Sequence, residues 1–169
     1  MKRRRTLITS LLLVAALALG IGYAALTDVL DINGSATINQ SAAEDAFDMD
    51  VYFSAAVANE EGNTASVNSN DNDKASFTVN TLKGKGDKAT FTFTITNNGD
   101  VDAEVTPTLG ATDGNSNPEY FAVTSDWNGQ AKTIAAGGSM TYTVTIELLK
   151  TPTETIEGSF HIVLNAVAE

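Results

Sequence analysis

The chain has 169 residues, a formal net charge of −11, no cysteine and a single histidine. This length suits one domain or two, and the lack of cysteine excludes a disulfide framework, a thiolate nucleophile and cysteine-ligated metal sites. All 21 acidic residues follow residue 25, and because so acidic a body repels phosphate backbones, we expect no nucleic-acid partner.

Residues 1–25 have the order of a secretory signal peptide. A basic start is followed by an apolar run over residues 7–19 and then by the small residues Gly22, Ala24 and Ala25, which is the order that signal peptides have. Small residues at −3 and −1 favour cleavage after Ala24, and cleavage after Ala25 is the alternative. An uncleaved anchor is a further alternative, because residues 7–25 approach the length that spans a bilayer core. We expect export, with membrane contact only transiently through this peptide.

Residues 26–40 are predicted to form an amphipathic strand next to the cleavage site. Apart from Asp28, apolar or small residues recur at alternate positions, and this face carries Leu26, Leu30, Ile32, Gly34, Ala36 and Ile38. Such a strand can pair within its own domain or act as a donor strand that fills the groove of a neighbour. Head-to-tail exchange of that kind does not close, so it produces filaments. On this hypothesis, deleting residues 26–38 leaves a folded monomer that cannot polymerise.

Gly34, at the centre of that apolar face, has two interpretations. A glycine inside a strand marks either a close backbone approach or a β-bulge, and the sequence leaves both open.

The rest of the chain alternates apolar and polar residues with the period of half-buried strands. The clearest runs are 47–53, 89–95, 140–148 and 160–164, with weaker ones at 76–80, 101–109 and 120–124. No segment after residue 40 has an apolar stripe of helical length. We therefore predict an all-β fold, an antiparallel β-sandwich or jelly roll, as a single domain over residues 41–169. The polar stretch 59–74 is predicted to be one long mobile loop.

Two segments of the chain resemble the TasA/camelysin family. Gly-Tyr-Ala-Ala-Leu-Thr-Asp at residues 22–28, directly after the apolar run, resembles the SipW-type signal junction of that family. Residues 82–99 resemble its core segment, in which Leu-Lys-Pro-Gly-Asp leads into a strand and Asn-Asn-Gly. Here Gly84 stands where proline is common, and one extra residue precedes Asp87.

The resemblance implies cleavage after Ala25 and an extracellular jelly-roll protein. Several members of the family polymerise into biofilm-matrix fibres, and some were described as metalloproteases. We therefore expect a secreted, Gram-positive-like extracellular or cell-surface subunit that self-associates into fibres, with residues 26–40 as the candidate donor strand. The alternative is a soluble secreted β-sandwich module that binds carbohydrate or a partner protein.

Charge predicts how such assembly is controlled. After residue 25 the chain has 6 basic and 21 acidic residues, a net charge of −15. Like charge discourages uncontrolled pairing of exposed strand edges. Acid, salt or cations that screen this repulsion are therefore expected to promote assembly.

The residues do not support an enzyme or a cofactor. A zinc protease of the zincin type needs two histidines one helical turn apart and a glutamate base, whereas His161 is the chain's single histidine and faces away from Phe160 in a predicted strand. No Gly-x-Ser-x-Gly elbow is present. The carboxylate pair Asp48 and Asp50 is of a kind expected by chance among 21 acids. We assign no catalytic, cofactor-binding or metal-ligating residue.

Two minor sites complete the predictions. Residues 68–73 and 113–117 offer hard oxygen atoms for weak calcium binding, although neither has the glycine and distal glutamate of an EF-hand loop. Trp127 lies near a turn and is expected to be a partly buried loop anchor rather than a sugar-stacking platform.

Overall fold

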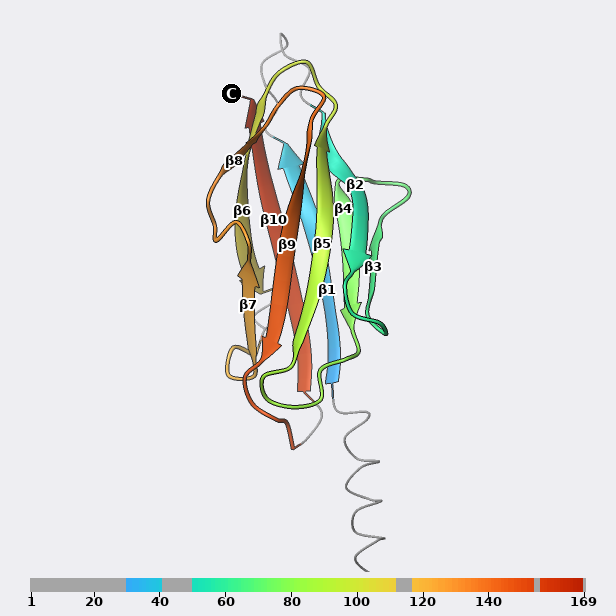
Figure 1. Ribbon diagram of the computed structural model, residues 1–169, viewed down its shortest axis with the longest axis vertical. Helices are drawn as coiled ribbons and strands as arrows, with labels where there is room; N and C mark the ends of the chain where they lie inside the picture. Colours follow the sequence, from blue (N-terminus) through green and yellow to red (C-terminus); the bar gives the residue numbers. More distant parts are fainter. Residues whose placement is uncertain (1–29, 41–49, 112–116, 154–155, 169) are drawn as a thin grey trace, which may run out of the picture.

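A computed structural model describes residues 30–40, 50–111, 117–153 and 156–168. The described residues form two β-sheets packed face to face as a β-sandwich (Figure 1), so the all-β prediction is confirmed. The predicted signal peptide, Ala24, Ala25 and Leu26 lie outside the described residues.

Six strands form the larger sheet and four form the smaller one. The larger sheet has the order β3 (Thr64–Val67), β4 (Lys74–Val79), β1 (Leu30–Gln40), β10 (Ile156–Ala168), β6 (Ala103–Ala111) and β8 (Lys132–Ile134). The smaller sheet has the order β2 (Val51–Ala58), β5 (Lys88–Asn97), β9 (Ser139–Leu148) and β7 (Phe121–Ser125). Among the described strands every pair is antiparallel except β1 with β10, which is parallel.

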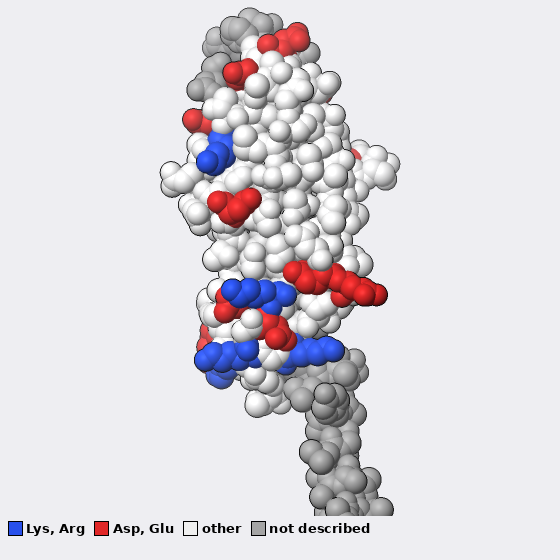
Figure 2. Space-filling view, in the orientation of Figure 1, with Lys and Arg blue, Asp and Glu red and all other residues white. Residues whose placement is uncertain are grey.

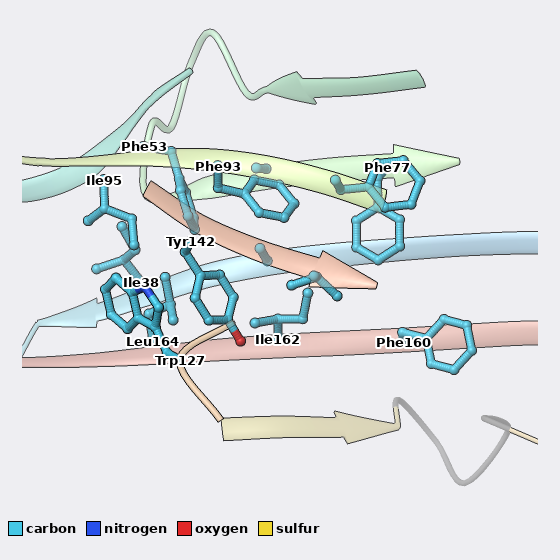
Figure 3. Close-up of a cluster of buried hydrophobic side chains, with 14 of the residues drawn as sticks. Ile38, Phe53, Phe77, Phe93, Ile95, Trp127, Tyr142, Phe160, Ile162 and Leu164 are labelled. Atoms are coloured by element: carbon cyan, nitrogen blue, oxygen red, sulfur yellow. The ribbon is translucent and has the colours of Figure 1, made fainter. Parts of the chain in front are cut away.

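The core lies between the sheets and follows the alternation of the sequence. Along β5, Ala89, Phe91, Phe93 and Ile95 are buried, while the threonines between them face outward. Aromatic rings cross from sheet to sheet, as where Phe77 of β4 lies 4.6 Å from Phe91 between ring centroids. Figure 3 shows this cluster, which buries the inward faces of both sheets.

Most predicted strands are present, and the exceptions have a physical reason. The predicted loop 59–74 is wrong at its centre, because β3 lies there and pairs with β4. β3 is an edge strand of four residues without a fully buried side chain, so its polar alternation gives little apolar signal. β8 was not predicted either, since Ile134 is its one buried residue. In the run 47–53, the described strand β2 begins at Val51, and residues 47–49 lie outside the description.

Candidate functional site

β1 lies in the interior of the larger sheet, between β4 and β10 (Figure 1). All of residues 30–40 pair in parallel with residues 156–166 of β10, and residues 32–37 pair in antiparallel fashion with residues 74–79 of β4. We call the space between β4 and β10 the β1 slot. Because β1 pairs on both edges, its removal would leave two strands with unpaired backbone groups facing each other across the slot.

The connection of β1 to the fold is as important as its pairing. β1 is the first strand of the described fold, and its link to the other strands leaves from Gln40 and reaches β2 at Val51. The two walls of the slot, β4 and β10, belong to later parts of the chain. A different copy of β1 could therefore fill the slot without any rethreading of the other strands.

The inward face of β1 complements the walls of the slot. Ile32 and Ala36 are fully buried and Ile38 is 3% exposed. Small residues meet large ones along this face: Ile32 is the register partner of Gly158, and Gly34 is the partner of both Phe77 and Phe160. Burial of each isoleucine contributes roughly 1.5–3 kcal/mol.

This burial changes the expected result of deleting the strand. Without residues 26–38 the chain would expose Phe77 and Phe160, now 2% exposed each, together with two open strand edges. The deletion variant is therefore expected to be unstable or to aggregate. The burial of Phe77 and Phe160 against β1 thus argues against the stably folded truncated monomer that the sequence predicts.

The two interpretations of Gly34 are resolved in favour of close approach. The pairing of β1 with both neighbours runs through Gly34 without a shift in register, so no bulge occurs there. The ring of Phe77 lies directly against its backbone. Of the predicted donor residues, Leu30, Ile32, Gly34, Ala36 and Ile38 all fall in β1.

The outer face of β1 is polar and makes its own contacts. The Ser35 Oγ and His161 Nδ1 atoms are 2.8 Å apart, and Thr78 donates a hydrogen bond of 3.1 Å to the Asn33 side chain. His161 is half-buried on the face opposite Phe160, as predicted, and serves as a partner of β1. A slip of β1 by one residue would exchange these polar side chains with the buried apolar ones.

The end of β1 is fastened to the other sheet. The Gln40 side chain donates to the Val51 carbonyl at 2.9 Å and accepts from the Val51 N–H at 3.2 Å. In the turn before β4, the Asp73 carbonyl accepts from the Ile38 N–H at 2.8 Å, and the Asn72 carbonyl accepts from the Phe53 N–H at 2.9 Å. These four bonds hold the ends of β1 and β2 together.

Carboxylates gather at this fastened end. Burial raises the pKa of Asp73, and the negative charges of Asp71 and Asp50 raise this pKa further. Asp71 behaves in the opposite way, since its hydrogen bond to Lys74, 2.6 Å long, lowers its pKa. Ionisation of Asp73 is therefore less favourable in the folded protein than in water, and this residue lies beside the last pairs of β1.

The other sequence candidates are the two calcium loops and the pair Asp48 and Asp50. Within the described residues, no group of three or more histidine, aspartate or glutamate side chains is placed to hold a metal ion, residues 68–73 included. Most of the second calcium candidate, residues 113–117, lies outside the description, as does Asp48. Asp50 accepts a hydrogen bond of 3.3 Å from the Asn98 side chain.

Trp127 is a buried anchor, as predicted. It is 5% exposed, its ring N–H donates to the Thr141 carbonyl at 2.9 Å, and its ring meets Tyr142 edge-on at 5.1 Å (Figure 3). A buried ring of this kind offers no stacking platform to a sugar.

The outer face of the smaller sheet is largely uncharged. Threonines of β5 pair with threonines of β9 across it, among them Thr90 with Thr145 and Thr92 with Thr143. Figure 2 shows this face as a mostly uncharged centre with most of the charges toward the two ends. The ion pair between Lys88 and Glu147, 3.1 Å long, lies at one of those ends.

Sequence reasoning located β1 but missed the residues that receive it. The alternation predicts strands at Phe77 and at Phe160 but gives no reason to place them on either side of Gly34, because the order of strands in a sheet is a long-range property. The available signal was the lone glycine within an otherwise apolar face, which is typical of a close approach or of a β-bulge alike. In the part of the chain that the structure describes, no helix is long and apolar enough to span a bilayer.

Comparison with known proteins adds only distant structural likenesses. No protein family and no curated protein matches the sequence. The cupredoxin domain of amoB from Nitrosocaldus yellowstonii is 14% identical, with 47% of this chain and 56% of that one covered and a TM-score of 0.28. The major pilin from Streptococcus pyogenes is 10% identical, with coverages of 83% and 48% and a TM-score of 0.26. A variant of that pilin has the same identity, coverages of 83% and 49%, and a TM-score of 0.29.

The chain spans about half the length of these solved structures. At such scores the likeness assigns neither a family nor a function.

Proposed function

We propose that the chain, after loss of its signal peptide, is a secreted structural subunit that polymerises into extracellular fibres of a biofilm matrix or cell surface. In this proposal β1 leaves the β1 slot of its own molecule and fills the slot of the next one. Main-chain hydrogen bonds then supply affinity, and the inward side chains supply specificity. Each subunit gives one strand and receives one, so the contact continues from molecule to molecule.

The observation that carries the proposal is the position of β1. It is a first strand that is inserted between two later strands, and one link from Gln40 joins it to them. The resemblance of residues 22–28 and 82–99 to the TasA/camelysin family supports the same function. The net charge of −15 after residue 25 supports assembly that is started by acid or salt.

A disulfide trap tests the exchange directly. Thr37 of β1 and Val163 of β10 are register partners, and neighbouring strands about 4.8 Å apart lie within disulfide range. Thr37→Cys and Val163→Cys are introduced together into the chain that begins at Leu26, which has no other cysteine. Fibres are grown at pH 4, 6 and 8, viewed by electron microscopy, oxidised and separated by non-reducing denaturing electrophoresis.

The pattern of covalent products decides the outcome. Exchange links each molecule to the next and gives a ladder of oligomers, which the Thr37→Cys single variant does not give. Fibres that release only internally bonded monomers would show that β1 stays in its own slot, and the exchange mechanism would be wrong. Absence of fibres at every pH would instead contradict the structural role. Growth that is indifferent to pH between 4 and 8 would contradict the expectation that screening of the negative charge promotes assembly.

The alternative, a soluble module that binds carbohydrate or a partner protein, rests on the uncharged threonine face of the smaller sheet. The burial of Trp127 removes the one tryptophan that could have stacked on a sugar. A monomeric secreted protein that forms no filaments at high concentration would favour this alternative.

A further inference from the structure

Gly34 lies where both neighbours of β1 carry a phenylalanine. Its register partners are Phe77 on β4 and Phe160 on β10, and Figure 3 shows the two rings on either side of the β1 ribbon. A Cβ atom at Gly34 would lie 1.9 Å from the Cζ atom of Phe77, 2.2 Å from Cε2 and 2.4 Å from Cε1. Carbon atoms in contact are normally about 3.5–4.0 Å apart. The Phe77 ring therefore occupies the space that any other residue would need here.

The Phe77 ring is held in this place by the opposite sheet. Its side chain is 2% exposed, and its centroid lies 4.6 Å from that of Phe91 and 6.3 Å from that of Phe93, both on β5. Close-packed interiors have few voids into which such a ring could move. Because the Phe77 ring cannot move aside, the residue of β1 that lies opposite it has to be glycine.

The requirement for glycine opposite Phe77 fixes one alignment of β1 in the slot. A shift of two residues keeps the apolar face inward but brings Ile32 or Ala36, each with a Cβ atom, against Phe77. A shift of one residue turns the polar face inward. β1 contains a single glycine, so the alignment that places Gly34 at Phe77 is the one that avoids a clash.

We propose that Gly34 and Phe77 are the specificity-determining pair of the β1 slot. The ring of Phe77 admits an incoming strand only where that strand carries glycine, and β1 of a second copy of this chain satisfies the condition. Apolar strands without a glycine at that place are rejected by collision, which is discrimination against wrong partners. The identity of the incoming strand rests on the proposed function, whereas the fit of Gly34 to Phe77 also applies within one molecule.

Two substitutions test the pair. Gly34→Ala adds the colliding atom. Phe77→Leu removes Cε1, Cε2 and Cζ, the three atoms that the added Cβ would strike. The matched controls are Gly158→Ala on β10, where the nearest atom to an added Cβ lies at 3.0 Å, and Phe160→Leu, which shortens the other phenylalanine beside Gly34.

Thermal unfolding of the monomer measures the pair without any need for fibres. Gly34→Ala is expected to lower Tm by about 5–15 °C or to prevent folding, and Gly158→Ala is expected to lower it less. Phe77→Leu in the same chain as Gly34→Ala is expected to raise Tm again, and Phe160→Leu is not. The proposal is overturned if Gly34→Ala has the same Tm as the parent. It is also overturned if Phe160→Leu restores the Tm of the Gly34→Ala chain as well as Phe77→Leu does.

Mixing the single variants tests whether the strand comes from another molecule. Gly34→Ala and Phe77→Leu chains are refolded together from denaturant and assembled, because each then offers the other a slot that its strand can enter. Co-assembled fibres are expected where Gly34→Ala alone forms few or none. If rescue in the double variant succeeds but the mixture forms no joint fibres, a second copy is not the source of the strand and the proposed function fails. If rescue fails, the pair itself is refuted whatever the fibres do.

Discussion

β1 and β5 are both interior strands, one in each sheet, and they fill the core in opposite ways. β5 brings large side chains of its own, Phe91 and Phe93, and the chain connects it to β4 on one side and to β6 on the other, both in the larger sheet. β1 brings Gly34 and Ala36 to its centre and accepts the ring of Phe77 from β4. At its centre β5 supplies the large side chains, whereas the centre of β1 is small and is filled by a ring from β4, although Ile32 and Ile38 of β1 are also buried in the core.

This difference separates substitutions that destabilise the whole fold from substitutions that loosen β1 alone. Loss of a β5 side chain removes packing from both sheets at once, because its rings contact Phe77 of the opposite sheet. Loss of a β1 side chain weakens one strand in a slot whose walls remain paired to the rest of the fold. The four substitutions below test this contrast, in order of decreasing effect.

Phe93→Ala is expected to cost about 4 kcal/mol of unfolding free energy, because it leaves a cavity between the sheets. The loss is global, so hydrogen exchange should accelerate in β1 and β5 alike. Chemical denaturation measures the size and exchange mass spectrometry the distribution. Thr94→Ala, on the outward face of the same strand, is the control. Acceleration limited to β5 would contradict the central role assigned to this ring.

Ile38→Ala is expected to cost about 3 kcal/mol, since Ile38 is buried near the end of β1. Here the amides of β1 should lose protection before those of β5, because the strand can loosen while both sheets persist. Exposed Asn39 provides the control Asn39→Ala. Equal acceleration in the two strands would remove the distinction drawn above.

Gln40→Ala is expected to cost about 1 kcal/mol, because it removes two hydrogen bonds to Val51. Its larger effect should be kinetic: the disulfide ladder from Thr37→Cys with Val163→Cys should form faster. Gln130→Ala, at an exposed position, is the matched control. An unchanged rate of ladder formation would mean that this side chain does not retain β1.

Asp73→Asn is expected to have the smallest effect, and its sign depends on pH. Burial and nearby carboxylates raise the folded pKa of Asp73 above its ordinary 3.8, so the stability it contributes is present below that value and lost as pH rises through the folded pKa. The variant should therefore be slightly more stable than the parent at pH 7, and the difference should vanish below about pH 4. Melting curves from pH 3 to 8 check this, with Asp100→Asn as control. A parent that is the more stable at pH 7 would contradict it.

The sequence was sufficient for the fold class and for most strands. Alternation along residues 89–95 and 140–148 predicts β5 and β9, because the buried residues of each strand recur at every second position within one short segment. β3 and β8 were missed because short edge strands bury too little to produce that pattern. The pairing of β1 with β10, first strand with last, has no local signal at all.

Of the candidate site, the sequence predicts the residues of β1 but not the walls of the β1 slot. The amphipathic face of β1 could be read from the chain, and Gly34 stood out within it. The place of Phe77 opposite that glycine depends on a strand order that joins residues 34, 77 and 160, and periodicity carries no information at such separations. The Gln40 side chain on Val51 likewise depends on how the two sheets meet.

The parallel direction of β1 beside β10 sets the geometry of any chain of subunits. A strand that enters a neighbour in this direction brings its Gln40 to the end of that neighbour where Val51 also lies. The intervening segment 41–50 reaches about 36 Å at most when fully extended, whereas the 13 residues of β10 alone span about 43 Å. If the proposed exchange occurs, successive bodies joined this way would overlap lengthwise, and the axial repeat of such a fibre would be shorter than the subunit itself.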